Sequence, residues 1–226
     1  MPRQLTFDLP ARPALGRGDF FVSDANALAL TRLDDWKNWP GSKLLLHGPK
    51  GAGKSHLAQV WAGETGARIL SEAELADIGE NDADSGLIIE DVDELARHPG
   101  REEALFHLFN LTRDRQTPVL FTASAPVREW GLHLPDLLSR MQSIDVAVLS
   151  PPDDILLTAV LVKLFSDRQL AVKPGVIEYI SKRMERSFAA LQELVVALDS
   201  QALAENRAVT RGLAARVLDK LSETTA

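Results

Sequence analysis

KLLLHGPKGAGKSHLAQVWAGETG, residues 43–66, decides the fold, because an apolar run, a glycine-rich turn and a helical pattern follow one another directly in it. The run at 43–47 is typical of a buried strand, and Gly48 ends it. The helical pattern begins near Lys54 and is expected to stop near Gly63 or Gly66. A strand, a glycine-rich loop and a helix in this order predict a P-loop, the turn that binds nucleotide phosphates.

The loop itself, GPKGAGKS at 48–55, matches the pattern G-x-x-x-x-G-K-[ST]. Its glycines let backbone N–H groups turn toward phosphate oxygens, and the following helix adds the positive end of its dipole. We expect Lys54 to reach the β- and γ-phosphates and Ser55 to bind Mg²⁺. The alternative is a glycine-rich turn with a surface lysine. The predicted site for ADP or ATP comprises Gly48, Pro49, Lys50, Gly51, Ala52, Gly53, Lys54, Ser55 and His56.

A second acidic segment, GLIIEDVDEL at 86–95, supplies the carboxylates that such a site needs. Glu90 and Asp91 fall at the end of a predicted strand, where they can hold Mg²⁺ and orient an attacking water. Glu90 stands where the shorter Asp is usual, and its length can displace a metal-bound water, so we expect slow hydrolysis. The alternative is a solvated acidic turn, which is the interpretation that we favour for Asp93 and Glu94.

Further apolar runs of strand length alternate with helical patterns up to residue 150. Strands separated by helices predict an α/β fold with a parallel five-stranded sheet covered on both faces. One helix is expected to begin at Ser23 as N-cap, with Leu28, Leu30, Leu33 and Trp36 on one face. Another, at 101–115, is expected to turn inward Leu105, Leu108, Phe109 and Thr112. The five expected strands are 43–47, 67–70, 86–91, 118–124 and 144–149.

The pattern changes at Pro151 and Pro152, because every later segment has helical spacing. We therefore expect an extended N-terminal segment at 1–18, an α/β nucleotide-binding subdomain at 19–150 and an all-helical lid at 151–226. The absence of cysteine excludes disulfides and thiolate metal sites. A net charge of −7 argues against a broad nucleic-acid-binding face. With no signal peptide and no apolar run near ~18 residues, we expect a cytoplasmic protein without a membrane partner.

Four stretches together resemble the AAA+ module of the replication initiator DnaA over residues 18–220: GKSHL, LIIEDVDEL, PVLFTASAPVREWGLHLPDLLSRM and the helical region after 150. The sequence lacks the helix-turn-helix with which that initiator reads DNA, and it begins with a QL-x-hydrophobic peptide. In both respects it resembles the Hda family, the DnaA regulatory inactivators. The resemblance implies DnaA as partner, stimulated hydrolysis of DnaA-bound ATP, and no sequence-specific DNA binding.

The resemblance also assigns single residues. It places Arg140 at the arginine finger, which would act on the γ-phosphate of a neighbouring molecule, whereas from the residues alone Arg140 could pair with Asp136. It places Ser124 at a polar sensor position. The adenine pocket falls on Phe20, Phe21 and Val22, which could equally be core residues.

In the lid, the resemblance places Ala189 where the initiator has a phosphate-sensing arginine. We expect Arg186, taken to lie one helical turn earlier, to be displaced by roughly 5–6 Å from that position. Lys182, Arg183 and Arg186 are expected to form a solvated basic helical face.

The N-terminal stretch QLTFDLP, residues 4–10, alternates apolar and polar side chains before prolines that forbid a helix. From the residues alone it could be an edge strand or a tail on its own domain. The resemblance implies that it binds the β sliding clamp of DNA polymerase III through Gln4, Leu5, Phe7 and Leu9.

Three functions compete at this stage. The first is a nucleotide-gated regulator that is tethered to the clamp and offers Arg140 to DnaA. The second is an autonomous AAA+ ATPase or helicase-loader motor, and the third is a truncated initiator that binds DNA. Ala189 and the Glu90-Asp91 order favour the regulator, and a nucleotide-dependent homo-oligomer is compatible with it.

Overall fold

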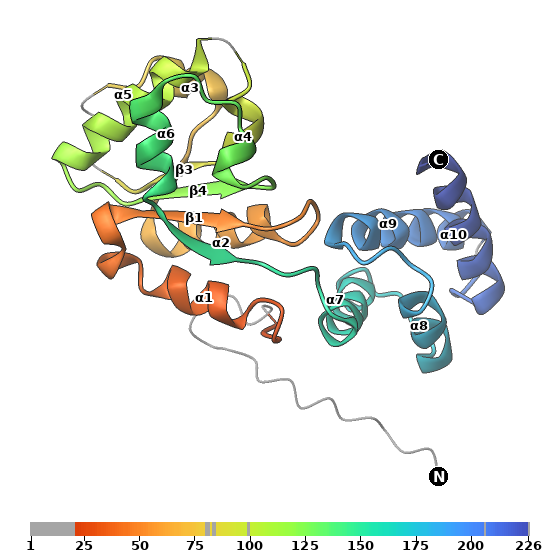
Figure 1. The fold of residues 1–226 in the computed structure, drawn as a ribbon. Coiled ribbons are helices and arrows are strands. Elements are labelled where there is room, and N and C mark those ends of the chain that lie inside the picture. Colours follow the sequence, from red (N-terminus) through yellow and green to blue (C-terminus); the bar gives the residue numbers. More distant parts are fainter. Residues whose placement is uncertain (1–20, 80–81, 83–84, 99, 206, 226) are drawn as a thin grey trace. The chain divides into compact units, whose positions relative to one another are not determined.

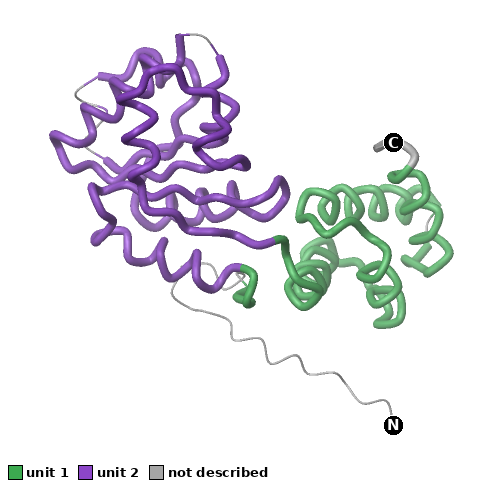
Figure 2. Tube along the Cα trace, viewed as in Figure 1, with its two compact units in different colours: residues 1–25, 151–226 green, residues 26–150 purple. Residues whose placement is uncertain are grey.

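The computed structural model describes residues 21–79, 82, 85–98, 100–205 and 207–225. The chain divides after residue 25 and again after residue 150 into two compact units (Figure 2). One unit, residues 26–150, contains the sheet, and the other contains the helices of residues 151–226. The proposed clamp-binding residues Gln4, Leu5, Phe7 and Leu9, and also Phe20, lie outside the described residues.

The sheet has five parallel strands in the order β2-β3-β4-β1-β5. The predicted α/β fold with a five-stranded parallel sheet is therefore confirmed. Because the strands are parallel, their carboxyl ends lie at one edge, and the loops that begin at Gly48, Glu90 and Ser124 leave the sheet there. The strands are β1 Lys43–His47, β2 Arg68–Ile69, β3 Leu87–Ile89, β4 Val119–Ala123 and β5 Asp145–Val148.

Helices cover both faces of the sheet: α1 and α2 lie on one face, and α3 to α6 lie on the other (Figure 1). The core on the second face contains Leu45, Ile89 and Phe121 from the strands, and they pack with Leu105 and Leu108. All four side chains that the periodicity turned inward on α5 are buried. The helices are α1 Ala27–Asp34, α2 Lys54–Thr65, α3 Glu72–Ala76, α4 Val92–Leu95, α5 Arg101–Asp114 and α6 Pro135–Gln142.

The first helix differs from its prediction. It begins at Ala27 after Asn26, because residues 24–26 form a turn in which the Ser23 hydroxyl accepts the Ala25 N–H at 3.3 Å. Its buried residues are Ala29, Leu30 and Leu33, whereas Leu28 is 68% exposed. Trp36 lies beyond the helix in a 3₁₀ turn, where its ring meets that of Trp61 edge-on at 6.3 Å.

The lid is all-helical, as predicted, with α7 Asp154–Asp167, α8 Pro174–Ser181, α9 Phe188–Glu205 and α10 Arg211–Thr225. Asp153 caps α7, because its carboxylate accepts the Leu156 N–H at 2.7 Å. The four helices enclose a core of their own that includes Leu161, Phe165, Ile180 and Leu198. Among the residues that the structure describes, none of the helices has the length and apolar character needed to cross a bilayer.

Candidate nucleotide site

The glycine-rich loop connects β1 directly to α2, as its pattern predicts. The local geometry requires glycine at positions that include Gly48 and Gly53. A Cβ at Gly48 would lie 2.6 Å from the backbone oxygen of Leu149, and Gly53, just before α2, has a φ of 95°. The N–H groups of the first turn of α2 have no intrahelical acceptor, so this loop can receive an anion.

Lys54 lies inside the loop rather than on the surface, since it is only 6% exposed. Its ammonium donates to the carbonyl of Gly48 at 2.8 Å, the carbonyl of Pro49 at 3.1 Å and the hydroxyl of Ser124 at 2.8 Å. Burial lowers the pKa of Lys54, and the negative charges of Asp91 and Asp93 partly oppose that shift. Phosphate oxygens could replace the two carbonyls without moving the lysine far, whereas Ser55 and His56 are exposed on α2.

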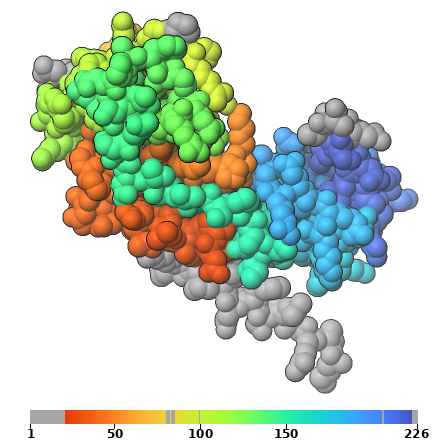
Figure 3. All heavy atoms as spheres, in the orientation of Figure 1, coloured from red at the N-terminus to blue at the C-terminus, as the bar shows by residue number. Residues whose placement is uncertain are grey.

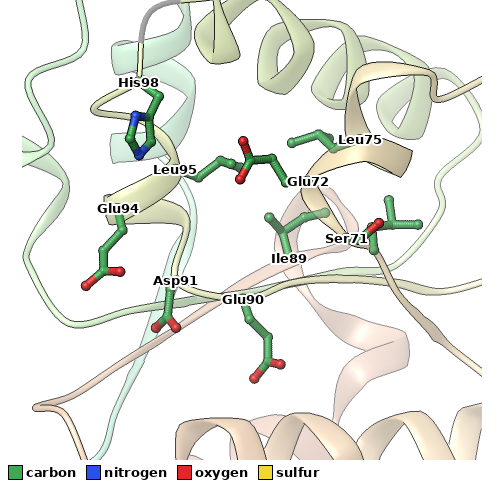
Figure 4. A pocket seen from close by; sticks show the side chains of 10 residues that line it. Ser71, Glu72, Leu75, Ile89, Glu90, Asp91, Glu94, Leu95 and His98 are labelled. Atoms are coloured by element: carbon green, nitrogen blue, oxygen red, sulfur yellow. The ribbon is translucent and has the colours of Figure 1, made fainter.

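The acidic turn follows β3 at the same edge of the sheet. Asp91 has left-handed backbone angles, φ 46° and ψ 45°, and its N–H donates to the hydroxyl of Thr122 at 2.9 Å. Such angles are uncommon outside glycine and often mark functional turns. Glu90 is half-buried and Asp91 is exposed, and Figure 4 shows both carboxylates pointing to the same side of the turn.

The donor chemistry of these residues fits Mg²⁺, which prefers carboxylate and hydroxyl oxygens. Within the described part of the chain, Glu90 Oε1 is buried and has no hydrogen-bond partner. No group of three or more His, Asp or Glu residues among those described could hold a metal ion by itself. Ser55, Glu90 and Asp91 could therefore hold Mg²⁺ only together with phosphate oxygens or water.

The expectation that Asp93 and Glu94 are solvated is correct for Glu94 and wrong for Asp93. Glu94 is exposed and pairs with Lys50 of the loop at 2.7 Å. Asp93 is instead 2% exposed, because the short helix α4 turns its side chain toward the end of β4. Its Oδ2 accepts the N–H groups of Ser124 at 3.1 Å and Ala125 at 2.9 Å.

A pocket of about 230 Å³ lies beside the acidic turn (Figure 4). Its apolar lining comes from residues of the sheet unit in or next to strands and helices, and its carboxylates include Glu90 and Asp91. Glu72, a third acid in the lining, pairs with Arg101. The full lining is Leu70, Ser71, Glu72, Leu75, Ile89, Glu90, Asp91, Glu94, Leu95 and His98.

Arg140 lies on α6, which Figure 3 shows in green at the surface of the sheet unit. Its guanidinium donates to Asn110 and, at 3.1 Å, to Asp136, so the pairing given above as the alternative is present. The guanidinium also lies 4.6 Å from the centre of the Phe106 ring. With 23% of its side chain exposed, Arg140 rests on α5.

The lid residues are arranged differently from the expected helical face. Helix α9 begins at Phe188, so Arg186 precedes the helix that carries Ala189 and pairs with Asp154 at 3.0 Å. The offset of one helical turn assumed for Arg186 is therefore wrong. Lys182 pairs with Glu178 at 2.7 Å.

The third cation, Arg183, contacts an aromatic ring: its guanidinium lies 4.1 Å from the centre of the Tyr179 ring. Helix α8 ends at Ser181, so the three cations do not share one helix. Phe21 and Val22, proposed for the adenine pocket, are half-buried.

The chain is similar in sequence and in fold to known proteins. A family model described as Hda, lid domain matches residues 154–218. The chromosomal replication initiator DnaA of Flavobacterium psychrophilum is 25% identical, over 89% of this chain and 48% of that protein. DnaA of Bacteroides fragilis is 26% identical, over 79% and 42% respectively. The chain thus spans about half or less of the length of these curated relatives.

Three solved structures share the fold. Domain III of Thermotoga maritima DnaA has a TM-score of 0.79 at 22% identity and covers 93% of this chain and 98% of its own. AMPPCP-bound DnaA from Aquifex aeolicus has a TM-score of 0.67 at 16% identity, over 82% and 65%. The RuvB branch migration motor of Thermotoga maritima has a TM-score of 0.61 at 17% identity, over 79% and 61%.

The parallel sheet, the P-loop and the helical lid give the chain the fold of an AAA+ P-loop module. Within that class of fold, the chain is similar to DnaA proteins, and its residues 154–218 match the family model described as Hda, lid domain.

Proposed function

We propose that this chain is a cytoplasmic, nucleotide-binding regulator of replication initiation, which promotes hydrolysis of DnaA-bound ATP and so inactivates DnaA. The observation that carries the proposal is the Hda lid match at 154–218, on a chain whose sheet unit has the fold of DnaA domain III. Residues 1–18 would tether the chain to the β sliding clamp of DNA polymerase III, residues 19–150 would bind nucleotide, and residues 151–226 would form the helical lid subdomain.

In this proposal the phosphates of ADP or ATP lie in the loop at 48–55, where Lys54 exchanges loop carbonyls for phosphate oxygens. Mg²⁺, held by Ser55, Glu90 and Asp91, would shield the phosphate charge. The longer Glu90 and the missing guanidinium at Ala189 both lower the expected rate of the chain's own hydrolysis. The bound nucleotide would then act as a structural cofactor more than as a substrate.

Arg140 would serve the ATP of a DnaA molecule across an interface. An arginine supplied in this way stabilises the charge that develops on the transferred phosphoryl group and raises hydrolysis by about 10³–10⁵-fold in known cases. To reach that phosphate, the guanidinium must exchange its bonds to Asn110 and Asp136 for phosphate oxygens.

The test mixes the protein with DNA-loaded clamp and ATP-bound DnaA and follows the loss of ATP from DnaA. We expect clear stimulation by the wild type and none by Arg140→Ala, while clamp binding persists. Arg128→Ala is the matched control, because Arg128 is an exposed arginine that pairs with its sequence neighbour Glu129 at 3.6 Å. Stimulation by Arg140→Ala equal to that of the parent would make the finger assignment wrong.

The motor alternative makes an opposite prediction for the protein alone. An autonomous ATPase should turn over ATP without DnaA, whereas the regulator should do so slowly. Turnover above ~1 s⁻¹, the low end for ordinary enzymes, would favour the motor. Lys54→Ala should abolish nucleotide binding in either case, so it reports on the site and not on the choice between functions.

A further inference from the structure

The turn after β4 is connected to helix α4 through one buried carboxylate. Oδ2 of Asp93 accepts the N–H of Ser124 at 3.1 Å and the N–H of Ala125 at 2.9 Å. The hydroxyl of Ser124 in turn accepts from the Lys54 ammonium at 2.8 Å. A continuous chain of hydrogen bonds therefore joins α4 to the lysine of the phosphate loop.

The burial of Asp93 calls for a physical reason, because a charged carboxylate that is 2% exposed is costly unless it is well compensated. Two backbone N–H groups compensate Oδ2, whereas Oδ1 is buried without a hydrogen-bond partner in the part of the chain described here. The nearby positive charge of Lys54 offers further compensation, and the charge of Asp93 in turn helps to keep that lysine protonated.

A second contact joins the same helix to the phosphate loop. Glu94, the residue after Asp93, pairs with Lys50 at 2.7 Å, and both side chains are exposed. An exposed ion pair contributes little to stability, so the buried Asp93 contact is the stronger of the two. Helix α4 thus meets the proposed nucleotide site at its loop and at the end of β4.

We propose that Asp93 is a positioning residue of the nucleotide site: by fixing the backbone at Ser124 and Ala125, it keeps the Ser124 hydroxyl on the Lys54 ammonium. The inference rests on the proposed nucleotide binding at this loop. In that role Asp93 touches no nucleotide itself and acts through Ser124. A purely structural Asp93 would instead anchor α4 to β4 and stabilise the fold without any link to nucleotide affinity.

A double-mutant cycle on ATP affinity separates the two roles. We expect Ser124→Ala to weaken ATP binding about tenfold and Asp93→Ala about fivefold, since the first removes the hydroxyl on Lys54 and the second only loosens its position. If Asp93 acts through Ser124, the double variant should also lose about tenfold, whereas independent effects would multiply to about fiftyfold. A fiftyfold loss in the double variant would overturn the proposal, as would wild-type affinity in Asp93→Ala.

A matched control cycle combines Ser124→Ala with Thr112→Val in place of Asp93→Ala. Thr112 is a buried polar residue whose hydroxyl donates within α5, to the carbonyl of Leu108 at 2.8 Å. Its loss should lower stability without changing nucleotide affinity, alone or with Ser124→Ala. If the wild type itself binds neither ATP nor ADP, the proposed function fails as well, whereas wild-type binding with multiplying effects removes only this inference.

A measurement on the wild type covers the case in which Asp93→Ala does not fold. Nucleotide bound at Lys54 should stabilise the hydrogen bonds that connect Lys54 through Ser124 to Asp93. The amides of Ser124 and Ala125 should therefore exchange hydrogen about tenfold more slowly when ADP is added. Unchanged exchange at these two amides, with slowed exchange in the loop at 48–55, would overturn the proposal.

Discussion

Lysine side chains in this protein illustrate how position changes the chemistry of a single residue type. Lys43 begins β1, is 2% exposed, donates to the carbonyl of Gly41 at 3.2 Å and lies 4.7 Å from the centre of the Phe109 ring. Burial, followed by the positive charge of Arg113, lowers the pKa of Lys43 from 10.5 to about 8. The sequence predicts Lys43 only as the first residue of a strand, because an apolar pattern does not show whether a lysine beside it is buried.

The lowered pKa of Lys43 predicts a pH dependence of stability. Between pH 8 and 10.5 the unfolded chain retains a proton on this side chain that the folded chain has lost. The free energy of unfolding should therefore rise with pH in that window, by about 3 kcal/mol if the full shift is realised. Urea unfolding of the wild type and of Lys43→Met at pH 7.5 and pH 10.5 checks this.

The difference between the two proteins isolates Lys43 from other groups that titrate in the same range. Lys43→Met should lack the rise, whereas Lys37→Met, at an exposed lysine beside Trp36, should keep it. The same slope in the wild type and Lys43→Met would show that Lys43 keeps its ordinary pKa in the folded state.

Asp93 marks the limit of prediction at the residue scale. The sequence shows four acids in a row of five residues, and nothing in that pattern separates the exposed Glu94 from the buried Asp93. Their difference comes from the left-handed backbone of Asp91, which starts α4 in a direction that turns Asp93 toward Ser124. Five residues, four of them acidic, are too short a stretch to show a periodicity from which such a turn could be derived.

At the scale of elements, the predicted strands and long helices were confirmed because their apolar patterns extend over enough residues. Three short helices were missed: α3, α4 and α6. Two of them have local signals that could have located them. Ser71 and Glu74 form a capping box before α3, and Pro135 stands at the first turn of α6. Only α4 lacks such a signal.

The contact between α5 and α6 leads to a prediction about Arg140. If Arg140 is the arginine finger proposed above, only molecules whose guanidinium is released from Asn110 and Asp136 can act on a partner. A small released fraction then weakens the apparent affinity for that partner. Asn110→Ala should therefore reduce the concentration needed for half-maximal stimulation of DnaA about three- to tenfold. It should also lower the free energy of unfolding by about 1 kcal/mol, since one hydrogen bond is lost.

Both quantities can be measured on one preparation, by titrating the variant into the DnaA assay and by urea unfolding. Thr158→Ala is a suitable control, because it also removes a half-exposed side-chain hydrogen bond, to Ser181, but in the lid. A loss of stimulation in Asn110→Ala comparable to that in Arg140→Ala would mean that Asn110 holds the guanidinium in its working position.

For the whole molecule, the division into a sheet unit and a helical unit follows from the change of pattern at Pro151 and Pro152. In the proposed function, the joint action of nucleotide, clamp and DnaA depends on residues 4–10 as a tether to the clamp. The segment at 4–10 alternates apolar and polar residues, so substitutions at the proposed contact positions can be compared with substitutions at the positions between them. Gln4→Ala with Phe7→Ala should weaken clamp binding at least tenfold, whereas Thr6→Ala with Asp8→Ala should leave it nearly unchanged.

Surface plasmon resonance on immobilised clamp measures these affinities, and nucleotide binding should remain the same in both double variants. A tether acts by raising the local concentration of the tethered protein and makes no contact with the reacting ATP. The Gln4/Phe7 variant should therefore stimulate DnaA poorly at low concentration and recover wild-type stimulation when its concentration is raised. If stimulation stays low at every concentration while Arg140 is intact, the N-terminal segment contributes to the reaction with DnaA itself.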